Sequence, residues 1–398
     1  MAIGIVGNYG KKNEGDEAIL AGILNGLESA YGVEREEIVV FSHDPEATAS
    51  THGVRSEHLF YNKRTLLGKV IATARRNRRA VKKLDCMIIG GGGILMDLYK
   101  RSTVMFSLYG WLARRAHVPY AIYGAGAGPI ATKWGRRLMK TLNGKADVVA
   151  VRDETSRELL QSIGVQQDIA VIADPAFQVA IPEKDRTGKK EVQIGVTALP
   201  YRDGVYWPGG EPEKYQAYIK GMAMNLNRLL ADHPEANVNL FATKYPYDAD
   251  VAKEIFKHLE QPERCQVHAA ERNVYGVLEL VAGQDLIIGT RLHSLILGVN
   301  AKKPVIAVGY HQKVADFMEI IGCRDAMIPV SRLHHETDFF SRLYSEYRSG
   351  WSETKARFER ISHAMKTKEP DGMSLLKELL PRAEQLNSRK LANSHSRA

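Results

Sequence analysis

Four segments of the chain combine glycine with charged side chains of the kinds that bind anions or move protons. They occupy residues 7–17, 90–97, 152–153 and 289–294. Glycine lets backbone N–H groups approach a ligand closely, while guanidinium and imidazole groups hold carboxylate and phosphate oxygens. The segments follow short apolar runs, where α/β proteins bind ligands. Together they predict one anion-binding cleft to which two halves of the chain contribute.

The sequence Gly-Thr-Arg-Leu-His-Ser at residues 289–294 is the most specific of the four. It ends an apolar run and opens a helical pattern, so the N–H groups of a helix start would lie beside Arg291 and His293. Lys313 follows the next apolar run and adds a cation at the same edge of the sheet. We therefore expect an oxyanion site here. A histidine that only makes hydrogen bonds at the helix start is the alternative.

Arg152 follows the apolar run at residues 148–151, again on the ligand side of a parallel sheet. The adjacent Asp153 leaves two interpretations open. Arg152 either binds a ligand or forms a structural salt bridge.

Residues 7–17 join an apolar run to a helical pattern. Lys11-Lys12 is followed by Asn13 rather than Ser or Thr, which excludes a Walker loop. The two lysines are candidates for anion contact. Asp16 and Glu17 stand at the start of the helix. Their carboxylates either stabilise the helix N-terminus or take part in catalysis, and the sequence favours neither role.

Four consecutive glycines at residues 90–93 directly follow the apolar run 86–89. Packing does not explain them, because glycine costs up to about 1 kcal/mol relative to alanine in a regular element. Close approach of a ligand or of a partner loop is the better explanation. Asp97 then either orients a sugar hydroxyl or is a cap at the surface. The pattern lacks Gly-x-Gly-x-x-Gly, so it does not predict dinucleotide binding.

The elements that position these segments alternate between apolar runs and amphipathic stretches, which predicts an α/β protein with parallel sheets. In the first half, strands are expected at residues 3–6, 37–41, 86–89, 120–123, 148–151 and 169–172, and helices at 16–30, 65–84, 105–116, 133–143 and 154–163. In the second half, strands are expected at 192–196, 238–242, 286–288 and 304–308, and helices at 249–259 and 294–299.

The length of 398 residues predicts two domains, because single cores stop growing near ~250–300 residues. The polar stretch at residues 182–190 marks the expected boundary. We expect an N-terminal domain at 1–182, a C-terminal domain at 190–335, terminal helices at 336–384 and a disordered tail at 385–398.

The charge balance favours acidic partners without choosing among them. The chain holds 55 Lys and Arg against 46 Asp and Glu, a formal net charge of +9. The helix expected at residues 65–84 is basic and amphipathic, which is consistent with contact with an anionic membrane or with a solvated face packed on the sheet. The basic residues are not interleaved with aromatic ones, so nucleic acid is not an expected partner.

Cys86, Cys265 and Cys323 stand far apart, so neither a disulfide framework nor a zinc cluster is expected, and a reduced cytoplasmic setting fits. The N-terminus lacks the basic region of a signal peptide, and no apolar run approaches the ~20 residues of a membrane span. Asp248 and Asp250 have the spacing of a metal-binding pair. Because they open a predicted helix, helix capping is their expected role.

Taken in order, the motifs resemble those of polysaccharide pyruvyl transferases. They are Gly-Asn-x-Gly with Gly-Asp-Glu-Ala-Ile, Gly-Gly-Gly-Gly-x-Leu-x-Asp, Arg-Asp, Asp174-Pro175 and Gly-Thr-Arg-Leu-His-Ser. The resemblance covers roughly residues 3–320. Its nearest type is the bacterial CsaB-like enzyme that modifies a secondary cell-wall polymer.

This resemblance implies a fold similar to the GT-B glycosyltransferases, with two Rossmann-like domains facing across a cleft. It implies an enzyme that uses phosphoenolpyruvate as co-substrate, with no metal or further cofactor, to place a pyruvate ketal on a sugar. For the CsaB-like type, the acceptor would be the 4,6-hydroxyls of N-acetylmannosamine in a lipid-diphosphate-linked disaccharide. The product would anchor surface-layer proteins. Such an enzyme would work in the cytoplasm, peripheral to the inner face of the cell membrane.

The resemblance implies that Arg152, Arg291 and His293 hold the donor, with Lys313 as a further candidate, and the chemistry of the residues suggests the other roles. Donor contacts are expected at Arg152, Arg291, Leu292, His293 and Lys313. Acceptor contacts are expected at Asn8, Tyr9, Lys11, Gly92, Gly93 and Asp97. His293 either protonates the donor or only binds its phosphate, and Asp16, Glu17 or Asp97 would activate the acceptor. The insertion at residues 11–14 departs from the family pattern.

Two other functions fit the same architecture. A GT-B glycosyltransferase with a nucleotide sugar as donor would be stabilised by a nucleoside diphosphate. A non-catalytic module for glycan or phosphate would bind its ligand without turnover.

Overall fold

The computed structural model describes residues 1–98, 100–184, 190–205, 207 and 209–380. It divides the chain into two compact units. Unit 1 comprises Met1–Lys11, Asp16–Ala180 and the chain from Lys366 onward, and unit 2 comprises Lys12–Gly15 and Ile181–Met365. The expected tail at residues 385–398 and part of the expected boundary, residues 185–189, lie outside the described residues.

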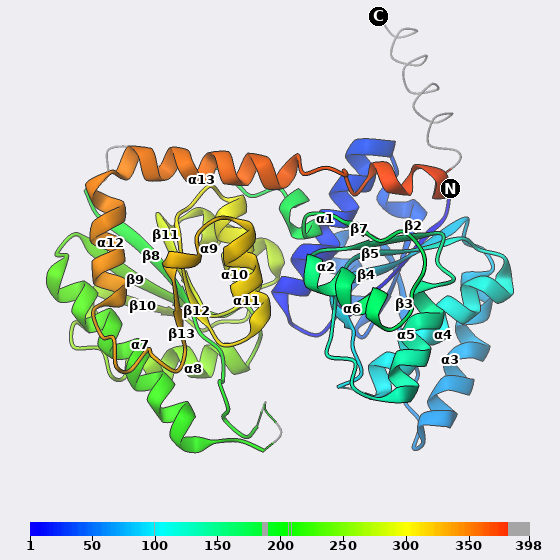
Figure 1. Ribbon diagram of the computed structural model, residues 1–398, viewed down its shortest axis with the longest axis horizontal. Coiled ribbons are helices and arrows are strands. Elements are labelled where there is room, and N and C mark those ends of the chain that lie inside the picture. Colours follow the sequence, from blue (N-terminus) through cyan, green and yellow to red (C-terminus); the bar gives the residue numbers. More distant parts are fainter. Residues whose placement is uncertain (99, 185–189, 206, 208, 381–398) are drawn as a thin grey trace, which may run out of the picture. The chain divides into compact units, whose positions relative to one another are not determined.

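Unit 1 contains a parallel sheet of seven strands (Figure 1). In sheet order the strands are β3 (Arg55–His58), β2 (Ile38–Ser42), β1 (Ile3–Val6), β4 (Cys86–Leu95), β5 (Tyr120–Ala127), β6 (Val148–Val151) and β7 (Ala170–Val171). The helices are α1 (Glu14–Tyr31), α2 (Pro45–His52), α3 (Leu66–Val81), α4 (Lys100–Ala116), α5 (Lys133–Asn143) and α6 (Glu154–Ser162). Strand order reverses at the neighbouring pair β1 and β4, and such a switch point is where open α/β sheets bind ligands.

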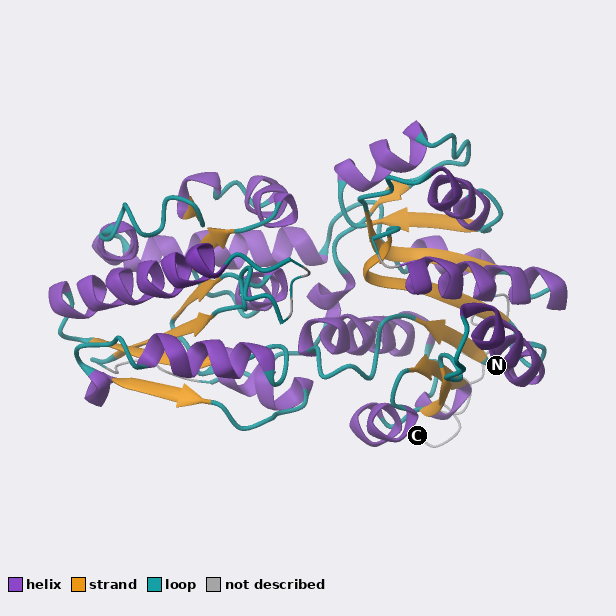
Figure 2. Ribbon diagram, turned by 90° about the horizontal axis from the view of Figure 1, so that it is seen from below, coloured by secondary structure: helices purple, strands orange, loops and turns teal. Residues whose placement is uncertain are grey.

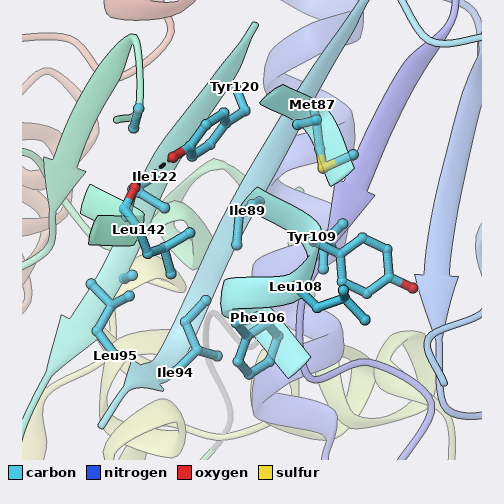
Figure 3. Close-up of a cluster of buried hydrophobic side chains, with 14 of the residues drawn as sticks. Met87, Ile89, Ile94, Leu95, Phe106, Leu108, Tyr109, Tyr120, Ile122 and Leu142 are labelled. Atoms are coloured by element: carbon cyan, nitrogen blue, oxygen red, sulfur yellow. Dashed lines mark hydrogen bonds between the residues drawn. The ribbon is translucent and has the colours of Figure 1, made fainter. Parts of the chain in front are cut away.

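Helices cover both faces of this sheet (Figure 2). The chain moves along the sheet in one direction through α1 and in the other through α3 to α6, so right-handed crossovers place these two groups on opposite faces. One apolar cluster joins the strands to the second group (Figure 3). In it, Phe106 and Tyr109 of α4 pack with Met87 and Ile89 of β4. This core fixes the strands whose carboxyl ends carry the glycine-rich segments.

Buried tyrosines at this core keep their hydroxyls satisfied. The Tyr120 hydroxyl donates to the Leu142 carbonyl at 2.6 Å, the bond drawn in Figure 3. The Tyr109 hydroxyl donates to the Leu59 carbonyl, also at 2.6 Å. Because each buried hydroxyl has a partner, the large rings add apolar contact without an unpaired polar group.

The glycine run, expected to follow the strand at residues 86–89, is part of β4. The strand continues through it to Leu95 and stays paired with β5, with a register shift between Gly92 and Leu95. A Cβ on Gly90 would lie 1.9 Å from the Tyr123 carbonyl oxygen, whereas Gly91 and Gly92 have φ angles of +80° and +68°. The expectation that packing does not explain these glycines is therefore wrong for Gly90, which the neighbouring strand requires.

Unit 2 has a parallel sheet of six strands. Their order across the sheet is the same as that of the first six strands of the unit 1 sheet. In sheet order they are β10 (Cys265–His268), β9 (Ala236–Phe241), β8 (Val192–Thr197), β11 (Leu286–Gly289), β12 (Val305–Gly309) and β13 (Met327–Pro329). The helices are α7 (Pro212–Asp232), α8 (Tyr247–Phe256), α9 (Val274–Ala282), α10 (Leu292–Asn300), α11 (Gln312–Ile320), α12 (Phe339–Ser349) and α13 (Trp351–Lys366). Its switch point lies between β8 and β11, so the segment at residues 289–294 stands at the switch point.

Short 3-10 turns complete the two units. They are η1 (Arg35–Glu37), η2 (Pro175–Gln178), η3 (Pro262–Arg264), η4 (Arg324–Ala326) and η5 (Ser374–Leu379). Residues 367–380 pack within unit 1, where the Tyr31 hydroxyl donates to the Met373 carbonyl. A Cβ on Gly372 would lie 2.5 Å from the Tyr123 hydroxyl. These contacts explain why the last turn belongs to unit 1.

The two parallel sheets confirm the α/β class and the pair of Rossmann-like units. In the part of the chain that the structure describes, no helix is long and apolar enough to traverse a bilayer. Several elements were not expected from the sequence: α2, β3, α7, β10, α9, α11 and β13. Of these, β3 reads Arg-Ser-Glu-His and is largely exposed, so it lacks the apolar pattern of a buried strand.

The packing of Gly90 yields a stability prediction. Gly90→Ala should lower the free energy of unfolding by about 1–3 kcal/mol, because its methyl group would overpack the β4–β5 pair. Gly93→Ala is the matched control, since its methyl group would meet the flexible end of Met96 at 3.0 Å. Urea denaturation followed by circular dichroism measures both variants. Equal losses in the two would contradict this explanation of the glycine run.

Candidate functional site

A charged junction of unit 2 lies where β11 leads into α10. Arg291 is the N-cap residue of α10, so its side chain leaves the backbone where the first N–H groups of that helix begin. The Nε and Nη2 atoms of Arg291 donate to the Asp248 carboxylate at 3.1 and 2.5 Å. The Arg291 side chain is 14% exposed and that of Asp248 is fully buried. The pair therefore holds one planar cation in a fixed orientation at the switch point.

Asp248 also organises the loop between β9 and α8. Its carboxylate accepts hydrogen bonds from the Thr243 N–H at 3.3 Å and from the Lys244 N–H at 3.0 Å. The expected role of helix capping is wrong, because the N-cap of α8 is Pro246 and the partners of Asp248 precede the helix. Asp248 is thus a positioning residue for Arg291, although its place before a predicted helix suggested a capping role.

The insertion in the first segment completes this junction. Residues Lys12–Gly15 belong to unit 2, where the Glu14 N–H donates to the Thr243 carbonyl at 2.8 Å. Asn13 forms an antiparallel bridge with Lys244. These bonds set Gly15 against the His293 ring, since a Cβ on Gly15 would lie 2.4 Å from Nδ1. The departure from the family pattern therefore has a structural role beside His293.

Lys313 lies at the next helix start along the same sheet edge. Strands β11 and β12 are parallel neighbours, so α10 and α11 both begin at their carboxyl ends. The Lys313 ammonium lies 5.4 Å from the Tyr310 ring centroid. Leu292 itself is 6% exposed, so its predicted donor contact would come from its backbone N–H. This edge combines two cations, an imidazole and helix-start amides, a set suited to carboxylate and phosphate oxygens.

In unit 1, the loop after β1 forms a chain of polar contacts. Asn8 Nδ2 donates to Asp16 at 3.2 Å, and Asn8 Oδ1 lies 3.2 Å from His43 Nε2. Burial, with the nearby charge of Lys11, lowers the pKa of His43 to about 3. His43 is therefore neutral near pH 7 and donates to Asn8. A Cβ on Gly92 would lie 2.8 Å from Asp16 Oδ1, so the glycine segment of β4 approaches this carboxylate.

Glu17 and Tyr9 stabilise the loop after β1 by hydrogen bonds. Glu17 accepts from the Gly10 N–H at 2.7 Å and lies 3.0 Å from Nε2 of the buried His52. The Tyr9 hydroxyl donates to the Gly90 carbonyl at 2.9 Å, and Tyr9 is fully buried. Burial, followed by the charges of Asp16, Glu17 and Asp174, raises the pKa of Tyr9 well above its usual value. The contacts described for both side chains are structural, and their roles in catalysis and acceptor binding stay predictions.

Asp97 anchors the loop before α5. It accepts from the Ala131 N–H at 2.9 Å and from the N–H and the hydroxyl of Thr132 at 2.6 and 2.5 Å. Burial raises the pKa of Asp97, but these hydrogen bonds outweigh it and bring that pKa below its usual value. Asp97 is buried, so the interpretation as a surface cap is wrong, and its contact with a sugar hydroxyl stays a prediction. Gly93, beside it in β4, is exposed.

Arg152 is bound by two carboxylates of unit 1. Its Nε lies 3.4 Å from Asp153 and its Nη1 lies 3.3 Å from Asp174. Its guanidinium group also packs on Gly126, where a Cβ would lie 2.9 Å from Nε. Two acids therefore engage this one base. The geometry thus favours the structural salt bridge, the second of the two interpretations of Arg152.

The two units therefore differ in the charge at their switch points. Unit 1 gathers Asp16, Glu17 and Asp174 near Tyr9, which suits contact with hydroxyl groups and removal of a proton. Unit 2 presents Arg291, His293 and Lys313, which suits an anion. Among the described residues, no group of three or more His, Cys, Asp or Glu side chains is placed to hold a metal ion.

Sequence reasoning did not identify two polar residues of these sites, Asp248 and His43. Asp248 was visible as an acidic residue before a predicted helix, but its partner Arg291 lies 43 positions away. His43 follows β2, and the general rule that polar residues after parallel strands face ligands would have identified it. Neither contact is visible in local spacing.

Comparison with known proteins gives a family match. The family described as polysaccharide pyruvyl transferase matches residues 13–312. The amylovoran biosynthesis protein AmsJ of Erwinia amylovora is 24% identical over 376 residues, covering 84% of this chain and 89% of that protein.

Solved structures support the fold. The UDP-GlcNAc 2-epimerase of Neisseria meningitidis bound to UDP-GlcNAc has a TM-score of 0.63 at 12% identity, covering 96% of this chain and 100% of that chain. HepE of Anabaena in complex with UDP and glucose has a TM-score of 0.59 at 14% identity, covering 98% and 100%. At these identities the likeness concerns the fold alone, and it confirms a GT-B-like pair of Rossmann-like units.

The pKa of His43 predicts an effect of pH on stability. Its folded pKa lies below the unfolded value of about 6.5, so only the unfolded chain gains this proton as the pH falls. Stability is then lost from pH 6.5 downward, by up to about 2 kcal/mol at pH 5. Chemical denaturation at pH 7 and pH 5 should show a smaller acid loss for His43→Gln than for the wild type. An identical acid loss in both proteins would contradict this prediction.

Proposed function

The chain belongs to the polysaccharide pyruvyl transferase family, and from that premise we propose that it forms a pyruvate ketal on a glycan precursor. The donor of this family is phosphoenolpyruvate and the acceptor is a glycan. The observation that carries the proposal is the β11–α10 junction of unit 2, with its buried Arg291–Asp248 pair. Phosphoenolpyruvate bears a carboxylate and a phosphate, the two oxyanions that a guanidinium fork and helix-start amides bind best.

We assign the donor to unit 2. Arg291 would bind one oxyanion in two-pronged fashion, and the Leu292 N–H would bind a second oxygen. His293 and Lys313 would bind or protonate the remaining groups. Arg152 keeps its predicted donor role as a proposal, although its two carboxylate partners in unit 1 weigh against it.

The reaction needs one proton on the methylene carbon of phosphoenolpyruvate. That proton makes the neighbouring carbon electrophilic, one sugar hydroxyl attacks it and loses its proton, and phosphate leaves with the bonding electron pair. The second hydroxyl then closes the ketal and releases a proton. His293 is our proposed acid, because imidazole titrates near neutral pH and a positioned acid contributes about 10²–10⁴ in rate. Binding of the phosphate alone is its other proposed role.

We assign the acceptor to the acidic side of unit 1. Asp16 is the preferred base, since its hydrogen bond with Asn8 orients it and Gly92 lies against it. Lys11 and Gly93 are exposed beside these residues and remain proposed acceptor contacts. Glu17 is a weaker candidate, because Gly10 and His52 engage its carboxylate.

The proposed acceptor is the 4,6-diol of N-acetylmannosamine on a lipid diphosphate, as in the CsaB-like type, with surface-layer anchoring as the use of the product. The supporting observation is the order of the motifs along the chain. The relative AmsJ is described by amylovoran biosynthesis, so the acceptor must be decided by experiment.

The deciding experiment measures inorganic phosphate released from phosphoenolpyruvate by the purified chain. The reactions contain a synthetic N-acetylmannosaminyl-N-acetylglucosamine diphospholipid, a diphospholipid with N-acetylglucosamine alone, or no acceptor. We expect phosphate only with the first, together with a pyruvate-sized mass gain on that lipid. Phosphate release with another glycan would overturn the acceptor assignment. Stabilisation by UDP but not by phosphoenolpyruvate in a thermal melt would favour the nucleotide-sugar alternative.

The Arg291–Asp248 pair yields a kinetic prediction. Asp248→Asn retains a hydrogen-bond acceptor for Thr243 and Lys244 but loses the charge that orients Arg291. The KM for phosphoenolpyruvate should rise about 10- to 100-fold, since hydrogen bonds to charged groups contribute about 1.5–3 kcal/mol, with a smaller change in kcat. Initial rates measured over a range of phosphoenolpyruvate concentrations give KM and kcat separately.

Two further variants make the kinetic test specific. Arg291→Lys should raise KM similarly, because an ammonium group cannot form the two-pronged contact. Arg332→Lys is the matched control, since Arg332 is an exposed residue paired with Glu336. Unchanged donor KM in both Asp248→Asn and Arg291→Lys would place the donor elsewhere.

A further inference from the structure

The helices α3, α4 and α5 cover one face of the unit 1 sheet, and this face is basic. Helix α3 holds five Lys or Arg residues and α4 and α5 hold four each, whereas none of the three contains Asp or Glu. Their summed charge exceeds the net charge of the whole chain, +9. Because α4 packs against both α3 and α5, the described cations of the three helices form one continuous face. Its exposed cations are Arg75, Arg76, Arg78, Arg79, Arg114, Arg115, Lys133, Arg136, Arg137 and Lys140.

Large apolar side chains project from the same face. Leu67 and Ile71 on α3 are 69% and 42% exposed, and Trp111 on α4 is 53% exposed. Leu98, just before α4, is 63% exposed. Within the described part of unit 1, these four are the large apolar residues with high exposure. Exposed apolar groups gathered on one face mark an interaction site more often than scattered ones do.

The apolar and basic residues of α3 share one stripe. Leu67, Ile71 and Arg75 follow one another at four-residue spacing, so they lie one above the other on the helix. In a parallel α/β unit, each helix starts near the edge where the preceding strand ends. Leu67 and Leu98 therefore lie toward the carboxyl edge of the sheet, the edge that carries Asn8 and Asp16.

This combination fits an anionic bilayer better than another polyanion. Lys and Arg are attracted to the negative surface of anionic phospholipids, Trp favours the headgroup zone, and Leu and Ile gain by leaving water. A nucleic acid would neutralise the cations but leave Leu67 and Ile71 in water.

We propose that the α3–α4–α5 face of unit 1 docks on an anionic phospholipid membrane, with Leu67, Ile71 and Trp111 inserted among the headgroups. The inserted residues Leu67, Ile71 and Trp111 are not among the proposed donor and acceptor contacts, and docking does not depend on which sugar is the acceptor. Docking would bring the membrane to the carboxyl edge of the unit 1 sheet. A lipid-linked acceptor would then reach that edge without leaving the bilayer.

Vesicle sedimentation with the full chain tests the proposal. Vesicles of phosphatidylcholine mixed with phosphatidylglycerol should bind the protein, while vesicles of phosphatidylcholine alone should bind it far more weakly. Binding should fall as salt is added, since salt screens surface charge. Leu67→Ser with Ile71→Ser should weaken binding at least about tenfold. Arg75→Gln, Arg78→Gln and Arg79→Gln together should weaken it about a hundredfold.

Matched variants in unit 2 control for general changes in hydrophobicity and charge. Ile320→Ser replaces an apolar side chain that is 43% exposed and should bind like the wild type. Lys214→Gln, Arg228→Gln and Arg332→Gln together remove three exposed cations and should have little effect. Thermal melts confirm that each variant is folded.

Three results would overturn the proposal. They are equal binding to neutral and anionic vesicles, equal loss in the unit 2 controls, and binding of RNA in the absence of vesicle binding. None of these results bears on the transferase activity. That activity is tested separately, because phosphate release with a water-soluble acceptor analogue does not require a membrane. The failure of one proposal is thus distinguishable from the failure of the other.

Discussion

The buried ion pair between Arg291 and Asp248 is the constraint on which the unit 2 site depends. A buried carboxylate is tolerated only when its charge and its hydrogen-bonding capacity are both satisfied. The guanidinium group and two backbone N–H groups meet that need, and they come from the loops after β11 and β9. The same loop after β9 holds Asn13 and Glu14, which place Gly15 against His293. The ion pair therefore orients Arg291. Through the loop after β9 and the segment at residues 13–15, it also supports His293.

The two units use one architecture, with opposite charge at their switch points. Both sheets have the same order in their first six strands, so both offer a switch point at their carboxyl edges. Unit 1 fills its switch point with carboxylates around Asn8 and Tyr9, and unit 2 fills its own with cations and helix-start amides. A ketal transferase needs both environments, since its donor is a dianion at least and its acceptor hydroxyls must lose protons. This division of charge is the physical basis for assigning donor and acceptor to different units.

Much of this arrangement was predictable from local sequence. The alternation of apolar runs and amphipathic stretches predicted the α/β class, and β1, β6 and α5 have the bounds expected from their patterns. The glycine run shows the limit of such reasoning, because its close contact with Tyr123 arises only when β4 and β5 pair. Asp248 shows the same limit, since a salt bridge across 43 positions leaves no trace in spacing. Edge strands such as β3 were not predicted, because an exposed strand lacks the apolar residues by which a buried strand is recognised.

The most direct test of the central claim is amide hydrogen exchange of the full chain with and without phosphoenolpyruvate. If the donor binds at the start of α10, its oxyanions should accept bonds from helix-start amides and slow exchange across residues 290–296. Asp248→Asn should weaken that protection at the same donor concentration. Protection of another segment by phosphoenolpyruvate, with residues 290–296 unchanged, would contradict the account.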